Sequence, residues 1–295
     1  MKENILFAGP MNGGKTKKIK NLVKELINKN ESMLIVDPKE EYSDLFKNTD
    51  YEVNIINFRE PNSGVTFNPF LIAEEEYKNG NVDAAIDVIR SIFSNIFIVS
   101  DSVDPFWDNS AKDYLSGVAM YLLENDRELN FKEIGILLKE DEAAPVLKEY
   151  ISKVDVLDPV SVLAGTVIYA PVETRESILS VARQKLGVIL ARPNLLNMLS
   201  VNNKIELKDK KQVIIIINYD ETNFISNITN IVITQIINIL YKLKINYTLV
   251  LDNYHSLNDL DLNTIFASCN SRNISAIVGS RSVEKIKKEN FTEIN

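Results

Sequence analysis

The sequence predicts an α/β fold in which a mostly parallel sheet is interrupted by an inserted all-α domain. At both ends of the chain, short apolar runs alternate with segments of helical periodicity, and this alternation is typical of parallel sheets covered on both faces. Between the ends, amphipathic helical patterns follow one another with few β-rich segments. We therefore predict a discontinuous sheet domain over residues 1–70 and 193–295 and an all-α domain over residues 71–192.

The N-terminal part of the sheet domain begins with an apolar strand over Ile5–Ala8. The segment Lys15–Asn30 follows with its apolar side chains at helical spacing, which predicts a helix. Further strands are predicted over Ser32–Val36 and Val53–Asn57, with a short helix over Glu40–Phe46 between them. The order strand, helix, strand is the repeating unit of a parallel sheet.

The strand pattern returns after the insertion. Apolar runs at Val213–Ile217, Tyr247–Leu251 and Ile274–Val278 predict three more strands, and a helix is predicted over about Ile228–Lys242. The stretch Thr222–Tyr241 carries no charge, but its several amide side chains would be costly in a bilayer, so we interpret it as a buried helix rather than a membrane span.

One helix of the insertion has an unusually clear start. Asp104 is a suitable N-cap residue and Pro105 suits the first helical position, so a helix is predicted from here to about Glu124. Another helix is predicted to begin near Thr174, because apolar side chains recur on one face after it.

The main chemical signal is the run Gly9-Pro-Met-Asn-Gly-Gly-Lys15-Thr16, which satisfies the pattern GxxxxGK[ST] between a predicted strand and a predicted helix. In such a P-loop, backbone N–H groups surround phosphates and the helix N-terminus favours negative charge. Lys15 would neutralise β- and γ-phosphate oxygens, Thr16 would place its hydroxyl on Mg²⁺, and Gly14 would let the backbone approach the nucleotide. We predict ATP and Mg²⁺ as cofactors; the predicted nucleotide-binding residues are Gly9, Asn12, Gly13, Gly14, Lys15 and Thr16.

A P-loop site is also expected to have a carboxylate on the Mg²⁺ side, at the end of a neighbouring apolar strand. Asp252, which follows Thr248-Leu-Val-Leu, is our Walker B candidate. An aspartate after an apolar strand often only caps a turn, but the P-loop earlier in the chain favours the metal role. We predict Lys15 and Asp252 as catalytic residues and Thr16 and Asp252 as metal-binding residues.

Composition excludes other classes of site. The single cysteine and the single histidine, Cys269 and His255, cannot form a disulfide or a Cys/His metal site, and they fit a reducing cytoplasm. A net charge of -8 argues against a surface that coats nucleic acid by bulk electrostatics. Acidic Glu3 and the early P-loop argue against a signal peptide.

The order and spacing of several short blocks resemble the type IV coupling proteins, the TraG-like conjugative ATPases. The blocks are Gly9 to Thr16, Val36-Asp-Pro-Lys39, Phe67-Asn-Pro-Phe70, Asp104-Pro-Phe-Trp107, Glu173-Thr-Arg-Glu-Ser177, Leu251-Asp252 and Ser271-Arg-Asn-Ile-Ser275. The resemblance covers nearly all of the chain. It implies a RecA-like P-loop NTPase core interrupted by an all-α domain, hexameric rings docked at the cytoplasmic face of the inner membrane, and ATP-driven transfer of DNA or protein. Its implied partners are single-stranded DNA, a relaxase or other secretion substrate, and a longer coupling protein.

The chain departs from the pattern of this family at catalytic positions. Asn253 stands where the family has the glutamate that polarises the attacking water, and Arg281 aligns with its γ-phosphate-sensing glutamine. Asn270 replaces the first arginine of the next block, whereas Arg272 matches the second. An amide cannot accept a proton, so nucleotide binding should survive while hydrolysis is reduced.

Two functions therefore remain open at this point. One is a coupling-protein-like ATPase of conjugative or type IV secretion transfer. The alternative is a non-catalytic nucleotide-binding or adaptor module that recognises a substrate protein or an active coupling protein through its all-α domain. Relatives have further strands after the sensor block, so the strand that precedes the P-loop is expected to have an open edge if no strand follows Arg281.

Overall fold

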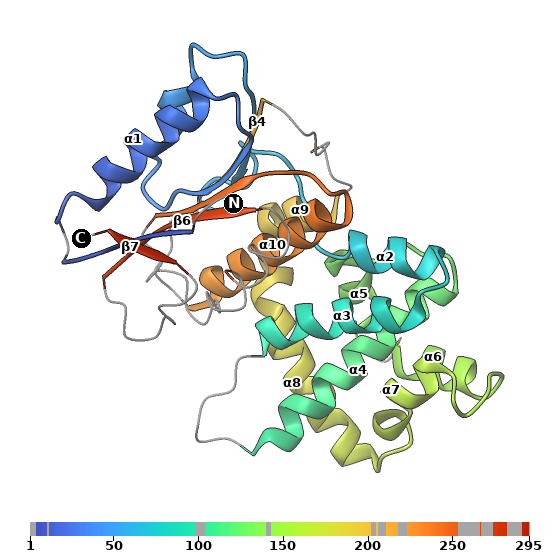
Figure 1. Cartoon of the computed structure of the whole chain (residues 1–295). Coiled ribbons are helices and arrows are strands. Elements are labelled where there is room, and N and C mark those ends of the chain that lie inside the picture. The colour runs from blue at the N-terminus through green and yellow to red at the C-terminus, as the bar shows by residue number, and fades with distance from the viewer. Residues whose placement is uncertain are drawn as a thin grey trace. The chain divides into compact units, whose positions relative to one another are not determined.

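The computed structural model describes residues 4–10, 12–97, 104–139, 143–201, 205, 211–217, 223–252, 266, 274–281 and 291–294 (Figure 1). The chain divides into two compact units, one of Met1–Val65 with Asn203–Asn295 and one of Thr66–Asn202. This division places residues 66–70 and 193–202 with the helices, whereas the sequence analysis assigned them to the sheet domain.

The first unit is built on a parallel sheet, which in the described part of the chain has seven strands in the order β3-β4-β2-β5-β6-β1-β7. Every described strand pair is parallel. The six strands predicted from the sequence are confirmed, with small shifts at their ends. The strands are β1 (Ile5–Ala8), β2 (Met33–Val36), β3 (Glu52–Asn57), β4 (Gln212–Ile217), β5 (Thr248–Leu251), β6 (Ser275–Ser280) and β7 (Thr292–Ile294).

Helices cover both faces of this sheet, which explains why its central strands are mostly apolar. All residues of β2, β5 and β6 are buried. Figure 1 shows α1 (Lys15–Asn28) on one side of the sheet and α10 (Asn223–Lys242) on the other. On the α1 side, the core also includes Tyr42 and, from the 3₁₀ helix η1 (Ser43–Phe46), Phe46.

Strand β7 corrects the expectation of an open edge beside the P-loop strand. It pairs with β1 in parallel register, with Ile5 opposite Thr292, and Thr292 N donates to Asn4 O at 2.7 Å. On the other side of β1, the side-chain oxygen of Asn4 accepts a hydrogen bond from Ala276 N at 3.0 Å. Strand β1 is thus fixed between two neighbours just before the P-loop.

The uncharged stretch near residue 230 forms α10, which begins several residues earlier than predicted. Its amide side chains include the buried Asn227, Asn230 and Gln235. Among the helices of the described residues, we find none that is long and apolar enough to cross a membrane.

The second unit is entirely helical where it is described. Its helices are α2 (Leu71–Lys78), α3 (Val82–Ile96), α4 (Pro105–Glu124), α5 (Phe131–Leu137), α6 (Ala143–Ile151), α7 (Pro159–Ile168), α8 (Val172–Leu190) and α9 (Pro193–Ser200). Helix α4 has the predicted bounds, because the side chain of Asp104 accepts a hydrogen bond from Phe106 N at 3.0 Å and Pro105 occupies the first turn. This is the N-cap that the sequence predicts.

The block Phe67-Asn-Pro-Phe70 has a structural role in the helical unit. The side chain of buried Asn68 donates to Leu129 O at 2.9 Å and accepts from Phe70 N at 3.1 Å. The ring of Phe70 packs against Phe93 and Phe131, with centroids 5.9 and 5.0 Å away. The block therefore anchors the first segment of this unit to two of its helices.

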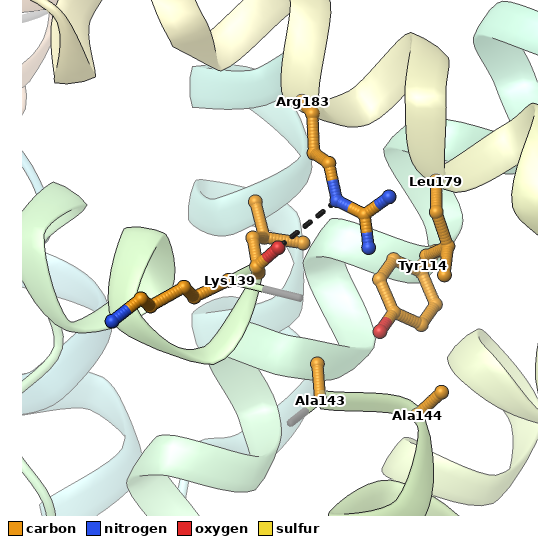
Figure 2. A pocket seen from close by; sticks show the side chains of 7 residues that line it. Tyr114, Lys139, Ala143, Ala144, Leu179 and Arg183 are labelled. Atoms are coloured by element: carbon orange, nitrogen blue, oxygen red, sulfur yellow. Dashed lines mark hydrogen bonds between the residues drawn. The ribbon is translucent and has the colours of Figure 1, made fainter. Parts of the chain in front are cut away.

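A small cavity in the helical unit is shown in Figure 2. Arg183 Nε donates to Leu138 O at 3.0 Å beside it, and the buried hydroxyl of Tyr114 has no hydrogen-bond partner among the described residues. The cavity volume of about 10 Å³ has room for no more than one water molecule. It is therefore no candidate for a nucleotide site.

Helices α4 and α7 approach each other so closely at Gly117 that this position should not tolerate a side chain. A Cβ atom there would lie 2.6 Å from Ala164 Cβ and 2.9 Å from Ala164 N. We expect Gly117→Ala to lower the free energy of unfolding by about 1–3 kcal/mol, measured by urea denaturation followed by circular dichroism. Gly165→Ala is the matched control, because a Cβ atom at Gly165 meets nothing within 4 Å. Equal unfolding midpoints for the two variants would contradict the tight helix contact.

Candidate nucleotide-binding site

Three chain segments of the sheet unit meet at the carboxyl ends of adjacent strands. The P-loop follows β1, Arg281 follows β6 and Asp252 follows β5, and β6 lies between the other two strands. Because neighbouring strands are about 4.8 Å apart, the P-loop and Asp252 leave the sheet about 10 Å from each other. Carboxyl ends of parallel strands are where open α/β sheets bind ligands. The topology thus brings together the two segments that the sequence analysis singled out.

The P-loop leaves β1 in a tight, hydrogen-bonded turn. Gly9 N donates to Ser280 O at 3.2 Å, which ties the start of the loop to β6, and Gly13 N donates to Pro10 O at 3.1 Å. Asn12 has a φ of 64° and Gly14 a φ of 77°, so both lie in the left-handed region. Glycine enters this region without a Cβ penalty and asparagine tolerates it better than most residues. Met11 of the motif lies outside the described residues.

The first turn of α1 is suited to an anion. Gly14 is its N-cap residue, no side chain caps the helix in the described structure, and the first turn contains no acidic residue. The N–H groups at a helix N-terminus have no partner inside the helix, and the helix dipole places partial positive charge there. An exposed N-terminus of this kind binds phosphate groups. The residues present therefore fit a nucleotide phosphate.

Lys15 and Thr16 are the first two residues of α1. Lys15 Nζ donates to Gly9 O and to Pro10 O, each at 2.7 Å, so its ammonium group lies against the P-loop backbone. An ammonium group has three donors, and these two bonds leave one for a phosphate oxygen. Thr16 is half-buried beside it. The predicted phosphate and metal residues of the loop are thus placed together at one helix end.

Asp252 is buried, with 3% of the residue's surface exposed, and Tyr42 forms a hydrogen bond to its carboxylate. The hydroxyl of fully buried Tyr42 donates to Asp252 Oδ2 at 2.9 Å. Burial, followed by the adjacent Asp252 carboxylate, raises the pKa of the Tyr42 hydroxyl above its ordinary value. The hydroxyl therefore keeps its proton at neutral pH and acts as the donor of this hydrogen bond.

Asp37, from the block Val36-Asp-Pro-Lys39, holds the loop that carries Tyr42. Its Oδ1 accepts from Glu41 N and its Oδ2 accepts from Tyr42 N, both at 2.9 Å. Burial raises the pKa of the Asp37 carboxyl, and the backbone donors of Glu41 and Tyr42 oppose that shift. Asp37 N also donates to Ile216 O at 2.8 Å, so the loop is attached to β4. This block therefore builds the loop next to the Walker B candidate.

Tyr42 is the residue of this site that the sequence analysis missed. Its partner Asp252 is 210 residues away, and no local pattern signals a contact between a tyrosine and a distant carboxylate. Arg281 is exposed and directly follows β6, whose Ser280 is opposite Ala8. Arg281 therefore follows the strand next to the P-loop strand, and its alignment with the family's glutamine stays a prediction.

Two of the departures, Asn253 and Asn270, lie outside the described residues, as do His255 and Arg272, of which Arg272 matches the family pattern. Their predicted roles stay predictions.

A family model described as Type IV secretory system Conjugative DNA transfer matches residues 2–249. The chain belongs to this family. The match contains the whole P-loop and ends within β5, shortly before Asp252. No curated protein matches the chain.

Solved structures of this kind of protein share the fold. The bacterial conjugative coupling protein TrwBΔN70 matches with a TM-score of 0.65 and 16% identity over 96% of this chain and 64% of the TrwBΔN70 chain. TrwB in complex with ADP and Mg²⁺ gives the same TM-score and identity. VirB4 of Thermoanaerobacter pseudethanolicus matches with a TM-score of 0.54 and 15% identity over 96% of this chain and 70% of VirB4. The resemblance to the coupling proteins and the predicted RecA-like P-loop core are thereby confirmed. This chain spans slightly less than two thirds of the TrwBΔN70 chain.

Proposed function

We propose that this chain binds ATP with Mg²⁺ at its P-loop, as the nucleotide-binding part of a machine that transfers DNA in conjugation or type IV secretion. The observation that carries the proposal is the helix end at Gly14, where an uncapped N-terminus meets the ammonium group of Lys15. A helix dipole, free backbone N–H groups and a lysine together are the elements that bind the phosphates of a nucleotide. TrwB, a coupling protein whose fold matches that of this chain, has solved structures in complex with ADP and Mg²⁺ and with a non-hydrolysable ATP analogue, which supports this ligand class.

The metal-side residues of the proposal are Thr16 and Asp252. Mg²⁺ is usually held by one or two protein groups together with substrate phosphates and water, not by a dedicated cage of side chains. Among the described residues, no group of three or more histidine, cysteine, aspartate or glutamate side chains could hold a metal on its own. A hydroxyl from the P-loop helix and a carboxylate from β5 fit a metal that arrives with the nucleotide.

Slow ATP hydrolysis is expected from this chain as it stands. Asn253 supplies an amide where a general base is needed, and an amide cannot take a proton from water. The amide at residue 253 therefore favours the second candidate function, a nucleotide-binding adaptor whose helical unit recognises a secretion substrate or an active coupling protein. The first candidate function is ATP-driven transfer of DNA. It implies contact with single-stranded DNA and a relaxase, a ring of identical chains, and attachment to an inner-membrane channel through partners.

Binding and turnover, measured on the same purified sample, test the proposal. We expect calorimetry to give micromolar or tighter binding of MgATP, and removal of Mg²⁺ with a chelator to weaken it, because the metal neutralises phosphate charge. ATP hydrolysis is then measured with and without single-stranded DNA. Turnover stimulated by DNA supports the transfer motor, tight binding with negligible turnover supports the adaptor, and no binding of MgATP overturns both.

A further inference from the structure

We propose that Tyr42 is a positioning residue for the Mg²⁺ side of the nucleotide site, which it serves by holding the Asp252 carboxylate. This inference rests on the proposed function. The hydroxyl of Tyr42 donates to Asp252 Oδ2 at 2.9 Å, and both side chains are buried, with exposed fractions of 0% and 3%. A residue that forms a hydrogen bond to a metal-ligating carboxylate fixes the orientation of that carboxylate. Loss of such a residue typically weakens metal binding.

The ring of Tyr42 is itself held on several sides. Its backbone N–H donates to Asp37 Oδ2, and its ring belongs to the core beneath the sheet. Lys20 Nζ lies 5.6 Å from the centroid of the ring, within the range of a cation–π interaction. Because the ring is fixed by backbone, packing and charge, its hydroxyl can impose a position on Asp252.

The same loop connects Asp252 to the helix that carries Thr16. Lys20 is on α1, one turn beyond Thr16, and its ammonium group forms an ion pair with Glu41 Oε2 at 2.8 Å. Glu41 and Tyr42 are adjacent in the loop that Asp37 holds. The loop therefore contacts the two elements that position the proposed Mg²⁺-binding residues. It contacts α1, which carries Thr16, through Lys20, and it contacts the end of β5 through Asp252. It thus links the helix that carries Thr16 to Asp252.

The first test compares nucleotide binding with and without the metal. For Tyr42→Phe we expect ADP to bind about tenfold more weakly in the presence of Mg²⁺ and unchanged in the presence of a chelator. The matched control is Tyr51→Phe, which also removes a phenol hydrogen bond within the sheet unit, from Tyr51 to Glu31 O at 2.8 Å. This variant should bind ADP like the wild type under both conditions. Urea denaturation of both variants measures the purely structural cost of losing the hydroxyl.

A second test asks whether Tyr42 acts through Asp252. Asp252→Asn should also weaken binding selectively in the presence of Mg²⁺, and the double variant with Tyr42→Phe should lose little more than Asp252→Asn alone. Additive losses, or a Tyr42→Phe defect of equal size with and without Mg²⁺, would show that the tyrosine acts by another route. Wild-type binding in Tyr42→Phe would overturn the inference and leave the proposed function intact. Absence of ADP binding in the wild type would instead overturn the proposed function and, with it, this inference.

Discussion

Lys15→Ala should weaken the binding of MgATP by about 10- to 100-fold. The ammonium group lies at the P-loop backbone, within reach of phosphates bound at the first turn of α1. Hydrogen bonds to charged groups contribute about 1.5–3 kcal/mol each, and every 1.4 kcal/mol changes a dissociation constant tenfold. The substitution also removes the two bonds from Nζ to Gly9 O and Pro10 O, which help to fix the loop. The lost phosphate contact and the lost loop hydrogen bonds both weaken nucleotide binding, and calorimetry with MgATP measures their combined effect.

Lys17→Ala is the matched control for this experiment. It removes the same charge from the same helix, and Lys17 is exposed. General electrostatic attraction for ATP changes equally in the two variants, so a difference between them reports the local contact. Urea denaturation should give similar midpoints for both. If Lys15→Ala binds MgATP as tightly as Lys17→Ala does, the nucleotide does not sit in this P-loop.

Features of the fold and of the site that depend on neighbouring residues could be predicted from the sequence. The start of α4 follows from Asp104 and Pro105, and the P-loop follows from its own glycines and from Lys15. Each of these features is set by side chains within a few positions of the backbone that they shape. Six of the strands were recognisable for a similar reason, because a strand buried on both faces is apolar at most of its positions.

Features that depend on contacts between distant segments could not be predicted from local patterns; Asp252 was selected because P-loop proteins are expected to have such a carboxylate. Because β6 lies between β1 and β5, the P-loop and Asp252 leave the sheet close to each other. The order of the strands depends on pairing between segments, so the sequence of a single segment does not indicate it. Strand β7 has only three residues, too few to show an alternating pattern. The hydrogen bond from Tyr42 to Asp252 joins positions that become neighbours only when β2 pairs with β5. Periodicity contains no information about such pairs.

Asn253→Glu should raise the rate of ATP hydrolysis by about 10²–10⁴-fold, the usual contribution of a general base. Asn253 directly follows Asp252, which stands at the carboxyl end of β5 beside the strand that neighbours the P-loop strand. A glutamate there can accept the proton of the attacking water, whereas an amide can only hold the water by hydrogen bonding. Phosphate release under saturating MgATP measures the effect, and the affinity for MgATP should change little.

Asn253→Gln is the control, because glutamine has the length of glutamate without its basic carboxylate. If the rate of hydrolysis rises in Asn253→Glu and stays low in Asn253→Gln, the gain comes from proton transfer to the carboxylate and not from the greater length of the side chain. Adding Lys15→Ala to Asn253→Glu should abolish the gain, since the nucleotide must first bind at the P-loop. If the wild type already hydrolyses ATP when DNA is present and Asn253→Glu adds nothing, another residue serves as the base. The adaptor function would then lose its support, because that support comes from the amide at residue 253.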